Sequence, residues 1–488
     1  MEIKEQLLEL INSDYRSQNF RFALDSLVVL MLEYYSKKEK KKITIMSNNP
    51  SVPYDVIFED GIDNLEGRVI ADIKIYRHPH IFFSRFYDTV GRYSMRGIEF
   101  DTLLLIIVND IPDRLLNRIE EEKKNLNFNL EIWDVNKLQE LFNQYKDYFD
   151  ELYSNLDKYF IKNTVNRALN NEDNLIENKE EYLKKIKEEY NNDKLALFLG
   201  AGSSYDAGIP GWDTLITNLL IELIEKELSE NSIQMDELTK SIVTKELFEQ
   251  NNSSPLLQTR FVRSGIEENF EESVRKILYK DVKESSDLLI QIVNLCIPNR
   301  GKFGIQAIIN YNFDDLVEKL LEARKIKYKS IYDEGMIVDQ SELGIYHVHG
   351  FLPRNGSEYG VPSSPSLVFS EEGYHKLILD SYNWSNIIQI NYMMTCTCVF
   401  IGLSLTDPNL RRLLEIVANK NIKGDESPRH YAILKRFKFK LQDEKDSVKS
   451  FEKTNRTLLE LYYQELGLNI IWVDDFKEIP ELLKKIKE

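Results

Sequence analysis

The stretch LALFLGAGSS, residues 195–204, decides how the second half of this chain is organised. Its leading apolar residues have the length of a buried strand, and the Gly-Ala-Gly that follows permits a tight turn. Backbone N–H groups in such a turn can approach a diphosphate at the start of a helix. The glycine pattern alone is a weak signal, because Tyr205 occupies the third position of a GxGxxG fingerprint.

Apolar segments with strand character alternate with helical stretches after this turn. The segments are residues 305–310, 344–348, 398–403 and 470–473. Alternation of this kind favours an α/β fold with a doubly wound, mainly parallel sheet. In open sheets of this type, ligands bind outside the carboxyl ends of the strands.

Polar groups follow three of these predicted strands. The motifs are NYNFDD at 310–315, HVHG at 347–350 and GLSLTDP at 402–408. They would collect an amide, a carboxylate, an imidazole and small phosphate-cradling residues along one edge of the sheet. Such a set suits chemistry on a ribose joined to a diphosphate.

Together these motifs resemble the sirtuin superfamily over residues 195–474. The matched elements, in order, are Gly-Ala-Gly-Ser-Ser with Gly208-Ile209-Pro210, Asn312-Phe313-Asp314, His349-Gly350, and Gly402-x-Ser404 with Asp407-Pro408. The likeness is greater to the prokaryotic NAD-hydrolysing branch than to the deacylases. It implies a Rossmann-like sheet with a small helical insertion, expected within residues 250–300.

The resemblance also implies roles for individual residues. Asn312 and Asp314 would face the nicotinamide ribose and a water, and His349 would act as the base. The residues expected to hold NAD are Gly200, Ala201, Gly202, Ser203, Ile209, Pro210, Gly402, Ser404 and Asp407. Because the pyridinium of NAD is already a competent leaving group, the pocket must stabilise an oxocarbenium-like ribose and admit a nucleophile. His347 is expected to be structural.

Deacylation and zinc binding are disfavoured. Deacylating sirtuins usually carry a four-cysteine zinc module, whereas this chain has Cys296, Cys396 and Cys398 and no CxxC pair. The sequence after Gly-Ile-Pro is Gly211-Trp212-Asp213, where deacylases have an Asp-Phe-Arg type of segment. Hydrolysis of NAD to nicotinamide and ADP-ribose is the reaction that the resemblance leaves.

The first part of the chain predicts a separate small α/β domain. Helices are expected at 22–35 and 82–92, and strands at 54–58, 68–76, 102–108 and 130–135. Asp72 and Lys74 share one face of a strand, and a hairpin could bring Asp55 beside Asp72. Two carboxylates and an amine suit a Mg²⁺-dependent phosphodiesterase with Asp55 and Asp72 as metal ligands.

The order of these elements over residues 15–145 resembles the PD-(D/E)XK restriction-endonuclease-like fold, especially its Mrr-like members. Asp55, Asp72 and Lys74 would be the nuclease motif, and a helix-borne acid, Asp25 or Glu33, would complete it. Two other interpretations stay open. Asp72 and Lys74 can form a solvated ion pair, or the fold can serve DNA or partner recognition without cleavage.

A chain of 488 residues is too long for one core. We expect a nuclease-like domain at 1–155, a linker with an exposed helix at 156–192, and a sirtuin-like domain at 193–488. The charged start and the lack of a membrane-length apolar run predict a cytoplasmic protein. A net charge of -17 argues against general nucleic-acid binding, and the one dense basic run, residues 37–42, is interpreted as a solvated helix end.

These expectations combine into an NAD-consuming antiphage effector, a role that rests on resemblance to bacterial fusions of this kind. Because a cell does not tolerate an unregulated NADase, we expect a homo-oligomer or a complex with a partner such as an ATPase. The nuclease-like domain would sense or cut nucleic acid, or dock that partner. The alternative is a metal-dependent nuclease whose sirtuin-like half only binds NAD or ADP-ribose as a signal. A scaffold with two relic pockets is a further alternative.

Overall fold

Two β-sheets organise the computed structural model, and each lies in a unit of its own. The first unit comprises Met1–Asn171, Asn421–Glu426 and Leu441–Glu465, and the second comprises Glu172–Lys420, Ser427–Lys440 and Leu466–Glu488. The structure describes residues 2–12, 19–45, 54–75, 99–155, 175–232, 270–298, 304–362, 366–369, 371–380, 382–420, 429–439 and 446–488, with single residues or pairs between 158 and 263.

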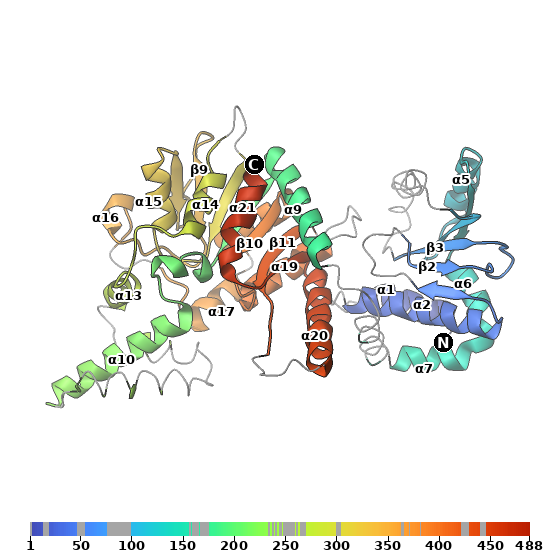
Figure 1. Ribbon diagram of the computed structural model, residues 1–488, viewed down its shortest axis with the longest axis horizontal. Coiled ribbons are helices and arrows are strands. Elements are labelled where there is room, and N and C mark those ends of the chain that lie inside the picture. Colours follow the sequence, from blue (N-terminus) through green and yellow to red (C-terminus); the bar gives the residue numbers. More distant parts are fainter. Residues whose placement is uncertain are drawn as a thin grey trace. The chain divides into compact units, whose positions relative to one another are not determined.

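The first unit contains a five-stranded sheet in the order β1-β2-β3-β4-β5 (Figure 1). Its strands are β1 Ile43–Ile45, β2 Val56–Phe58, β3 Val69–Lys74, β4 Thr102–Ile107 and β5 Asn129–Trp133. β1, β2 and β3 pair antiparallel, whereas β3, β4 and β5 pair parallel. This mixed sheet agrees with the small α/β domain expected from the sequence.

Helices cover both faces of this sheet. They are α1 Ile3–Asn12, α2 Asn19–Lys38, α5 Asp113–Lys123, α6 Val135–Phe142 and α7 Lys146–Ser154, and α20 Asp446–Glu465 is grouped with the same unit. Val69, Ala71 and Ile73 share a core with α1, α2, α6 and α7, while Ile70 shares a second core with Ile119 of α5. The strand β3 is thus buried on both faces, as its alternating residues require.

Most elements of the first unit were predictable from the sequence. The predicted helix 22–35 lies within α2, and the strands predicted at 54–58, 68–76, 102–108 and 130–135 are present with shorter ends. The helix predicted at 82–92 lies outside the described residues, and β1 was not predicted. In the basic run, α2 ends at Lys38, and Lys37 is exposed with its Nζ 2.7 Å from Glu33 Oε1, which agrees with a solvated helix end.

The second unit contains a fully parallel sheet of seven strands in the order β12-β11-β10-β6-β7-β9-β8. The strands are β6 Leu195–Leu199, β7 Ile305–Asn310, β8 Tyr328–Ile331, β9 Leu343–His347, β10 Thr397–Ile401, β11 His430–Lys435 and β12 Leu468–Val473. All five strands predicted in this half are present, and the doubly wound parallel sheet is confirmed. β8 and β11 were not predicted.

The order of the strands reverses at β6. After β6 the chain adds β7, β8 and β9 on one side, and it then returns to add β10, β11 and β12 on the other. In a doubly wound sheet, such a reversal opens a crevice at the carboxyl ends of the two strands beside it. The reversal here lies between β6 and β10, so the loops that follow these two strands flank the position where a ligand is expected.

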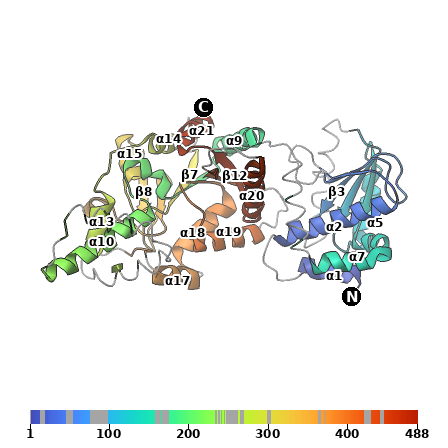
Figure 2. The same ribbon diagram turned by 60° about the horizontal axis from the view of Figure 1, so that its bottom comes forward.

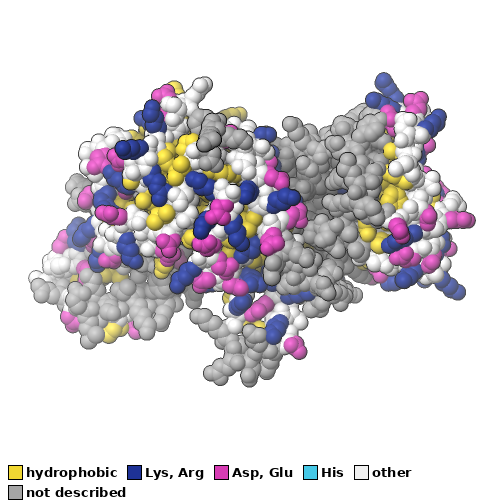
Figure 3. All heavy atoms as spheres, turned by 45° about the horizontal axis from the view of Figure 1, so that its top comes forward, with side chains coloured by type: hydrophobic (Ala, Val, Ile, Leu, Met, Phe, Trp, Pro, Cys, Tyr) yellow, Lys and Arg dark blue, Asp and Glu magenta, His cyan; other side chains and the backbone are white. Residues whose placement is uncertain are grey.

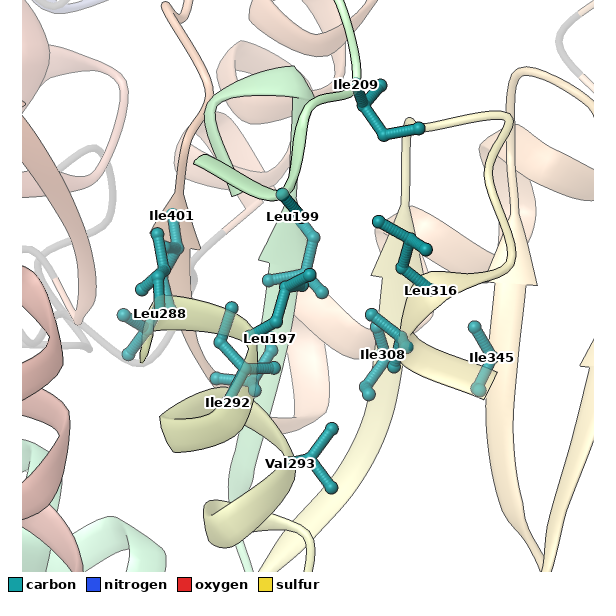
Figure 4. Close-up of a cluster of buried hydrophobic side chains, with 14 of the residues drawn as sticks. Leu197, Leu199, Ile209, Leu288, Ile292, Val293, Ile308, Leu316, Ile345 and Ile401 are labelled. Carbon is teal, nitrogen blue, oxygen red and sulfur yellow. The ribbon is translucent and has the colours of Figure 1, made fainter. Parts of the chain in front are cut away.

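Helices form a layer on each side of this sheet (Figures 1 and 2). They are α9 Leu175–Asn191, α10 Trp212–Glu230, α13 Phe270–Leu278, α14 Asp287–Leu295, α15 Leu316–Ala323, α16 Gly356–Tyr359, α17 Glu371–Leu379, α18 Trp384–Thr395, α19 Pro408–Lys420 and α21 Ile479–Lys487. α9, α14 and α21 lie along one face, and α18 and α19 lie along the other. Figure 4 shows Ile292 and Val293 of α14 facing Leu197 of β6 and Ile308 of β7.

The helix α9 corrects the expectation of an exposed linker helix within 156–192. Leu183, Ile186 and Tyr190 are buried in the core of the second unit, and the Tyr190 hydroxyl donates to the Leu295 carbonyl at 3.0 Å. The prediction was wrong because the many Lys and Glu residues of this segment hide an apolar stripe with helical spacing. The insertion expected within 250–300 lies partly outside the described residues, and its described part includes α13 and α14.

Charged side chains of both signs lie on the described surface. On the described surface visible in Figure 3, basic and acidic side chains are interspersed instead of separating into regions of one sign. Within the described ranges, the structure has no helix with both the length and the apolarity to cross a membrane.

Candidate active site

The loops after β6 and β10 touch backbone to backbone at the strand reversal. The N–H of Gly200 donates to the Ile401 carbonyl and the N–H of Gly202 donates to the Gly402 carbonyl, both at 3.0 Å. Gly402 has a φ of +69°, and a Cβ added there would lie 2.3 Å from the backbone N of Ser203. Both the conformation and the space at this position therefore require glycine.

Replacing Gly402 by alanine should be strongly destabilising. The Cβ would meet backbone, which cannot rotate away, so we expect the free energy of unfolding to fall by about 2 kcal/mol or more. Gly335→Ala is the matched control, because Gly335 also has a positive φ, +81°, but open space around its Cβ position. That control should lose only about 1 kcal/mol. Urea denaturation of both variants measures the difference, and equal losses would contradict the close approach of the two loops.

Asn312 joins the loop after β7 to the loop after β6. Its side-chain Nδ2 lies 3.1 Å from the Gly200 carbonyl, 3.1 Å from Ser203 Oγ and 3.2 Å from Ser204 Oγ. The side chain is largely buried, with 8% of the residue exposed. The structure thus brings together Asn312 and Ser203, two predicted site residues, and adds Ser204, which the sequence analysis did not single out.

Asp314 is held in the same group. Its Oδ1 accepts hydrogen bonds from the Leu316 N–H at 3.2 Å and from Ser204 Oγ at 3.3 Å, while Oδ2 is buried with no hydrogen-bond partner among the described residues. Burial first, and then the negative charge of Glu318, raise the pKa of Asp314 to about 6, against the hydrogen bond from Leu316. This carboxyl group therefore changes between its protonated and ionised forms close to neutral pH.

The raised pKa of Asp314 predicts a pH-dependent loss of stability. A carboxyl whose pKa is higher in the folded than in the unfolded protein stabilises the fold at low pH, and this contribution is lost as the pH rises from about 4 through about 6. Asp314→Asn cannot ionise, so its stability relative to the wild type should increase by up to about 3 kcal/mol between pH 4 and pH 8. Urea denaturation across this pH range measures it, with the exposed Asp333→Asn as control. A difference that does not change with pH would contradict the assignment.

His349 lies against the loops after β7 and β10. Its ring packs edge-on against the Tyr311 ring, with 4.6 Å between centroids, and its Nε2 lies 3.5 Å from Asp407 Oδ2. Burial lowers the pKa of His349, and the charge of Asp407 opposes this. The imidazole is therefore neutral at neutral pH, which is the form that accepts a proton.

Asp407, which was predicted as a residue that holds NAD, lies beside His349. Its Oδ1 accepts from the Leu410 N–H at 2.7 Å at the start of α19, and its Oδ2 faces the imidazole. The carboxylate therefore ties the histidine to the first turn of a helix. Its predicted contact with NAD stays a prediction.

The remaining predicted residues lie around these loops. Ala201 and Gly202 are exposed in a short 3₁₀ turn, Ala201–Ser203, and Ser404 Oγ lies 2.6 Å from Thr406 Oγ1. Ile209 belongs to the core, and Pro210 is half-buried. Sequence reasoning also missed Gln389 of α18, whose side chain accepts from the Tyr311 hydroxyl. A single glutamine in a helix offers no sequence signal for such a contact.

The first unit brings together the residues predicted for the nuclease motif. Asp72 and Lys74 form an ion pair of 2.8 Å, and the Ile73 N–H donates to Asp55 Oδ2 at 2.8 Å. Asp72 and Lys74 are 3% and 8% exposed, so the interpretation of a solvated pair is wrong. Among the described residues, no group of three or more His, Cys, Asp or Glu side chains is arranged to hold a metal.

Asp25, one of the two candidate helix acids, lies near Asp55. Burial raises the pKa of Asp55 well above its usual range, and the negative charges of Asp25 and then Asp72 raise it further, while Lys74 opposes them. Glu33 instead forms an exposed i,i+4 ion pair with Lys37. The electrostatics of the unit therefore favour Asp25 as the helix-borne acid.

Part of this chain is similar to known proteins. Residues 306–459 match the family model described as SIR2-like domain. The chain is 23% identical over 314 residues to NAD(+) hydrolase ThsA of Enterococcus faecium, which covers 63% of this chain and 58% of that protein. It is 22% identical over 313 residues to NAD(+) hydrolase ThsA of Bacillus cereus (strain MSX-D12), which covers 63% of this chain and 56% of that protein.

The alignments thus span less than two thirds of the length of these relatives. The match to the family model includes Asn312, His349 and Asp407, the residues that converge at the strand reversal. The parallel sheet of seven strands agrees with a Rossmann-like fold for this region. Residues 306–459, most of which belong to the second unit, are therefore similar to a SIR2-like domain.

Proposed function

We propose that the second unit hydrolyses NAD to nicotinamide and ADP-ribose. The observation that carries this proposal is a closed ring of contacts among four loops. Asn312 joins the loops after β6 and β7, and Tyr311 and His349 join those after β7 and β9. Asp407 then connects His349 to the loop after β10, which returns to β6 through Gly402. An amide, a buried carboxyl group and a neutral imidazole are thereby gathered at the strand reversal.

The chemistry of these groups fits hydrolysis at the ribose C1′ carbon. The C1′–N bond breaks with its electron pair leaving on nicotinamide, and a water forms the new C1′–O bond while passing a proton to His349. Asn312 and Asp314 would orient the ribose and the water beside the developing positive charge. The loop Gly200–Ser204 would hold the diphosphate, with Gly402, Ser404 and Asp407 on its other side.

The similarity to two proteins named NAD(+) hydrolase ThsA supports the same reaction. A role in antiphage defence is part of this proposal and rests on the resemblance described above. A cytoplasmic location, and control by self-assembly or by a partner such as an ATPase, are also part of it. Sedimentation of the protein with and without NAD and its partner would test the assembly.

Release of nicotinamide is the direct test of the proposed reaction. The full chain is incubated with NAD, alone and with its native partners, and nicotinamide and ADP-ribose are measured by liquid chromatography. The proposal expects the two products in equal amounts. Binding of NAD or ADP-ribose without release under every condition would instead favour the alternative of a ligand sensor.

We propose that the first unit has a second function as a Mg²⁺-dependent nuclease. Its order of elements resembles the PD-(D/E)XK fold. The observation in its favour is that the buried pair Asp72 and Lys74 lies beside the half-buried Asp55, whose pKa is raised by the charge of Asp25. Mg²⁺ is usually held by one or two carboxylates together with waters and substrate phosphates, so Asp55 and Asp72 suffice as protein ligands. Lys74 would contact the scissile phosphate or the attacking water.

Asp55→Asn separates this function from a structural role. Asparagine can keep the acceptor for the Ile73 N–H but removes one of several close negative charges, so we expect the variant to unfold at a higher temperature than the wild type at neutral pH. Added MgCl₂ should raise the melting temperature of the wild type and leave that of Asp55→Asn unchanged. Mg²⁺-dependent cleavage of plasmid DNA should be lost in the variant. A wild type that neither responds to Mg²⁺ nor cuts nucleic acid would leave only the recognition role.

A further inference from the structure

A buried polar cluster that the proposed reaction does not use lies beneath the Asn312 loop. It consists of Glu318 on α15, Ser330 on β8 and His347 at the end of β9, which are 0%, 6% and 0% exposed. These three residues come from three separate elements. They connect to the site through the backbone of Asn312.

His347 bridges the cluster to the backbone of the site. Its Nε2 lies 2.7 Å from Glu318 Oε1, and its Nδ1 lies 3.1 Å from the main-chain carbonyl oxygen of Asn312. Ser330 Oγ donates to the same Glu318 oxygen at 3.0 Å. Because a carbonyl oxygen can only accept, Nδ1 must carry a proton and donate it to Asn312.

The imidazole of His347 is held on its face as well as at both nitrogens. The Phe351 ring stacks on it, with 3.9 Å between ring centroids and 28° between planes. A side chain that is hydrogen-bonded at both ends and stacked in a buried site has one orientation available. The position of the Asn312 carbonyl is thereby tied to α15 and β8.

Burial of a carboxyl and an imidazole is costly, and well-packed apolar side chains would stabilise the same space more cheaply. What the polar pair provides, and apolar packing cannot, is a directional hydrogen bond to the Asn312 carbonyl. The side-chain amide of Asn312 donates hydrogen bonds to Ser203 and Ser204, and Asp314 lies two positions further along the chain. A rotation of this peptide would move both groups.

We propose that Glu318 and His347 are positioning residues for the reaction. They hold the backbone at Asn312 so that its amide and the Asp314 carboxyl group face the ribose. This inference rests on the proposed NAD hydrolysis and adds residues that do not touch the substrate. A merely structural pair would affect only the stability of the fold.

The test compares variants at His347 in the full chain by steady-state nicotinamide release. His347→Leu removes the donor to Asn312, and we expect kcat to fall about 10- to 100-fold with KM changed less than about threefold. His347→Asn keeps an N–H near the position of Nδ1 and should recover at least about tenfold of that loss. The buried control is His430→Leu, since His430 accepts from the Cys398 N–H at 3.1 Å away from these loops. It should lower stability without changing kcat per folded molecule.

Glu318 supplies a second pair of variants in case His347→Leu does not fold. Glu318→Gln can still hydrogen-bond His347 and should keep kcat within about threefold, whereas Glu318→Met should lower it at least about tenfold. Activities are corrected for the folded fraction measured by circular dichroism. Losses that vanish after this correction, or no rescue by the conservative variants, would overturn the positioning role. Absence of nicotinamide release by the wild type would overturn the proposed function instead, so the two failures are distinct.

Discussion

Asn312→Ala is expected to lower nicotinamide release from NAD by about 10²- to 10³-fold, the usual cost of removing one polar group that stabilises a transition state. The physical reason is that the Asn312 side chain holds three groups of the loop after β6 at once. Its Nδ2 donates to the Gly200 carbonyl, to Ser203 Oγ and to Ser204 Oγ. Its loss would take the amide away from the proposed ribose site and remove one hydrogen bond from each of Ser203 and Ser204 at the same time. Most of the effect should appear in kcat.

The control for this variant is Asn355→Ala. Asn355 is an exposed asparagine that accepts from the Ser357 N–H at the start of α16. Its replacement should change nicotinamide release less than twofold, because the site is exposed and away from the chemistry, although loss of this helix cap should cost about 1 kcal/mol in stability. Equal activity of Asn312→Ala and the wild type would reject the assignment of Asn312.

His349→Ala should lower kcat by about 10³-fold, within the range usual for the loss of a general base. The imidazole is buried against Tyr311 and faces Asp407, so the variant loses the group that we propose as the base. Asp407→Asn should have a smaller effect, because it removes the charge beside the base but keeps the base. If His349→Ala retained full activity, the histidine would be one more buried side chain and the water would need another base.

The pH dependence of kcat/KM separates the two titratable groups. Burial lowers the pKa of His349 below its ordinary 6.5, so the neutral base should persist into more acidic solution and activity should fall only below that value. Asp407→Asn removes the opposing charge and should move this fall to still lower pH. A limb near pH 6 would belong to Asp314, and it should be absent from Asp314→Asn.

The sequence was sufficient for the parallel sheet because its strands are short and apolar and end in distinctive polar motifs. β8 and β11 were missed for opposite reasons. β8 begins with Tyr328 and Lys329, which are not buried, at the edge of the sheet. β11 begins with His430, a polar residue that is buried only because its Nδ1 accepts from a neighbouring strand. Such pairing is a tertiary property.

The candidate site was predicted as a set of residues, but their mutual contacts were not. Motif order indicated that Asn312, Asp314 and His349 lie at strand ends, and the structure places them there. The hydrogen bonds of Asn312 to both serines, and the pairing of His347 with Glu318, depend on how separate loops meet. Spacing along a chain carries no information of that kind. The prediction of an exposed helix at α9 failed for a related reason, since its few apolar residues gain their meaning only from the surface against which they pack.

The grouping of α20 with the first unit has a consequence for biosynthesis. This helix is encoded between β11 and β12, two neighbouring strands of the second sheet, yet it sorts with residues near the amino terminus. The last segment grouped with the first unit is therefore synthesised only when the ribosome has passed residue 465, long after the rest of that unit. For the same reason a single protease cut near residue 171 yields an amino-terminal fragment that lacks α20, whereas the carboxy-terminal fragment keeps every segment of the second unit.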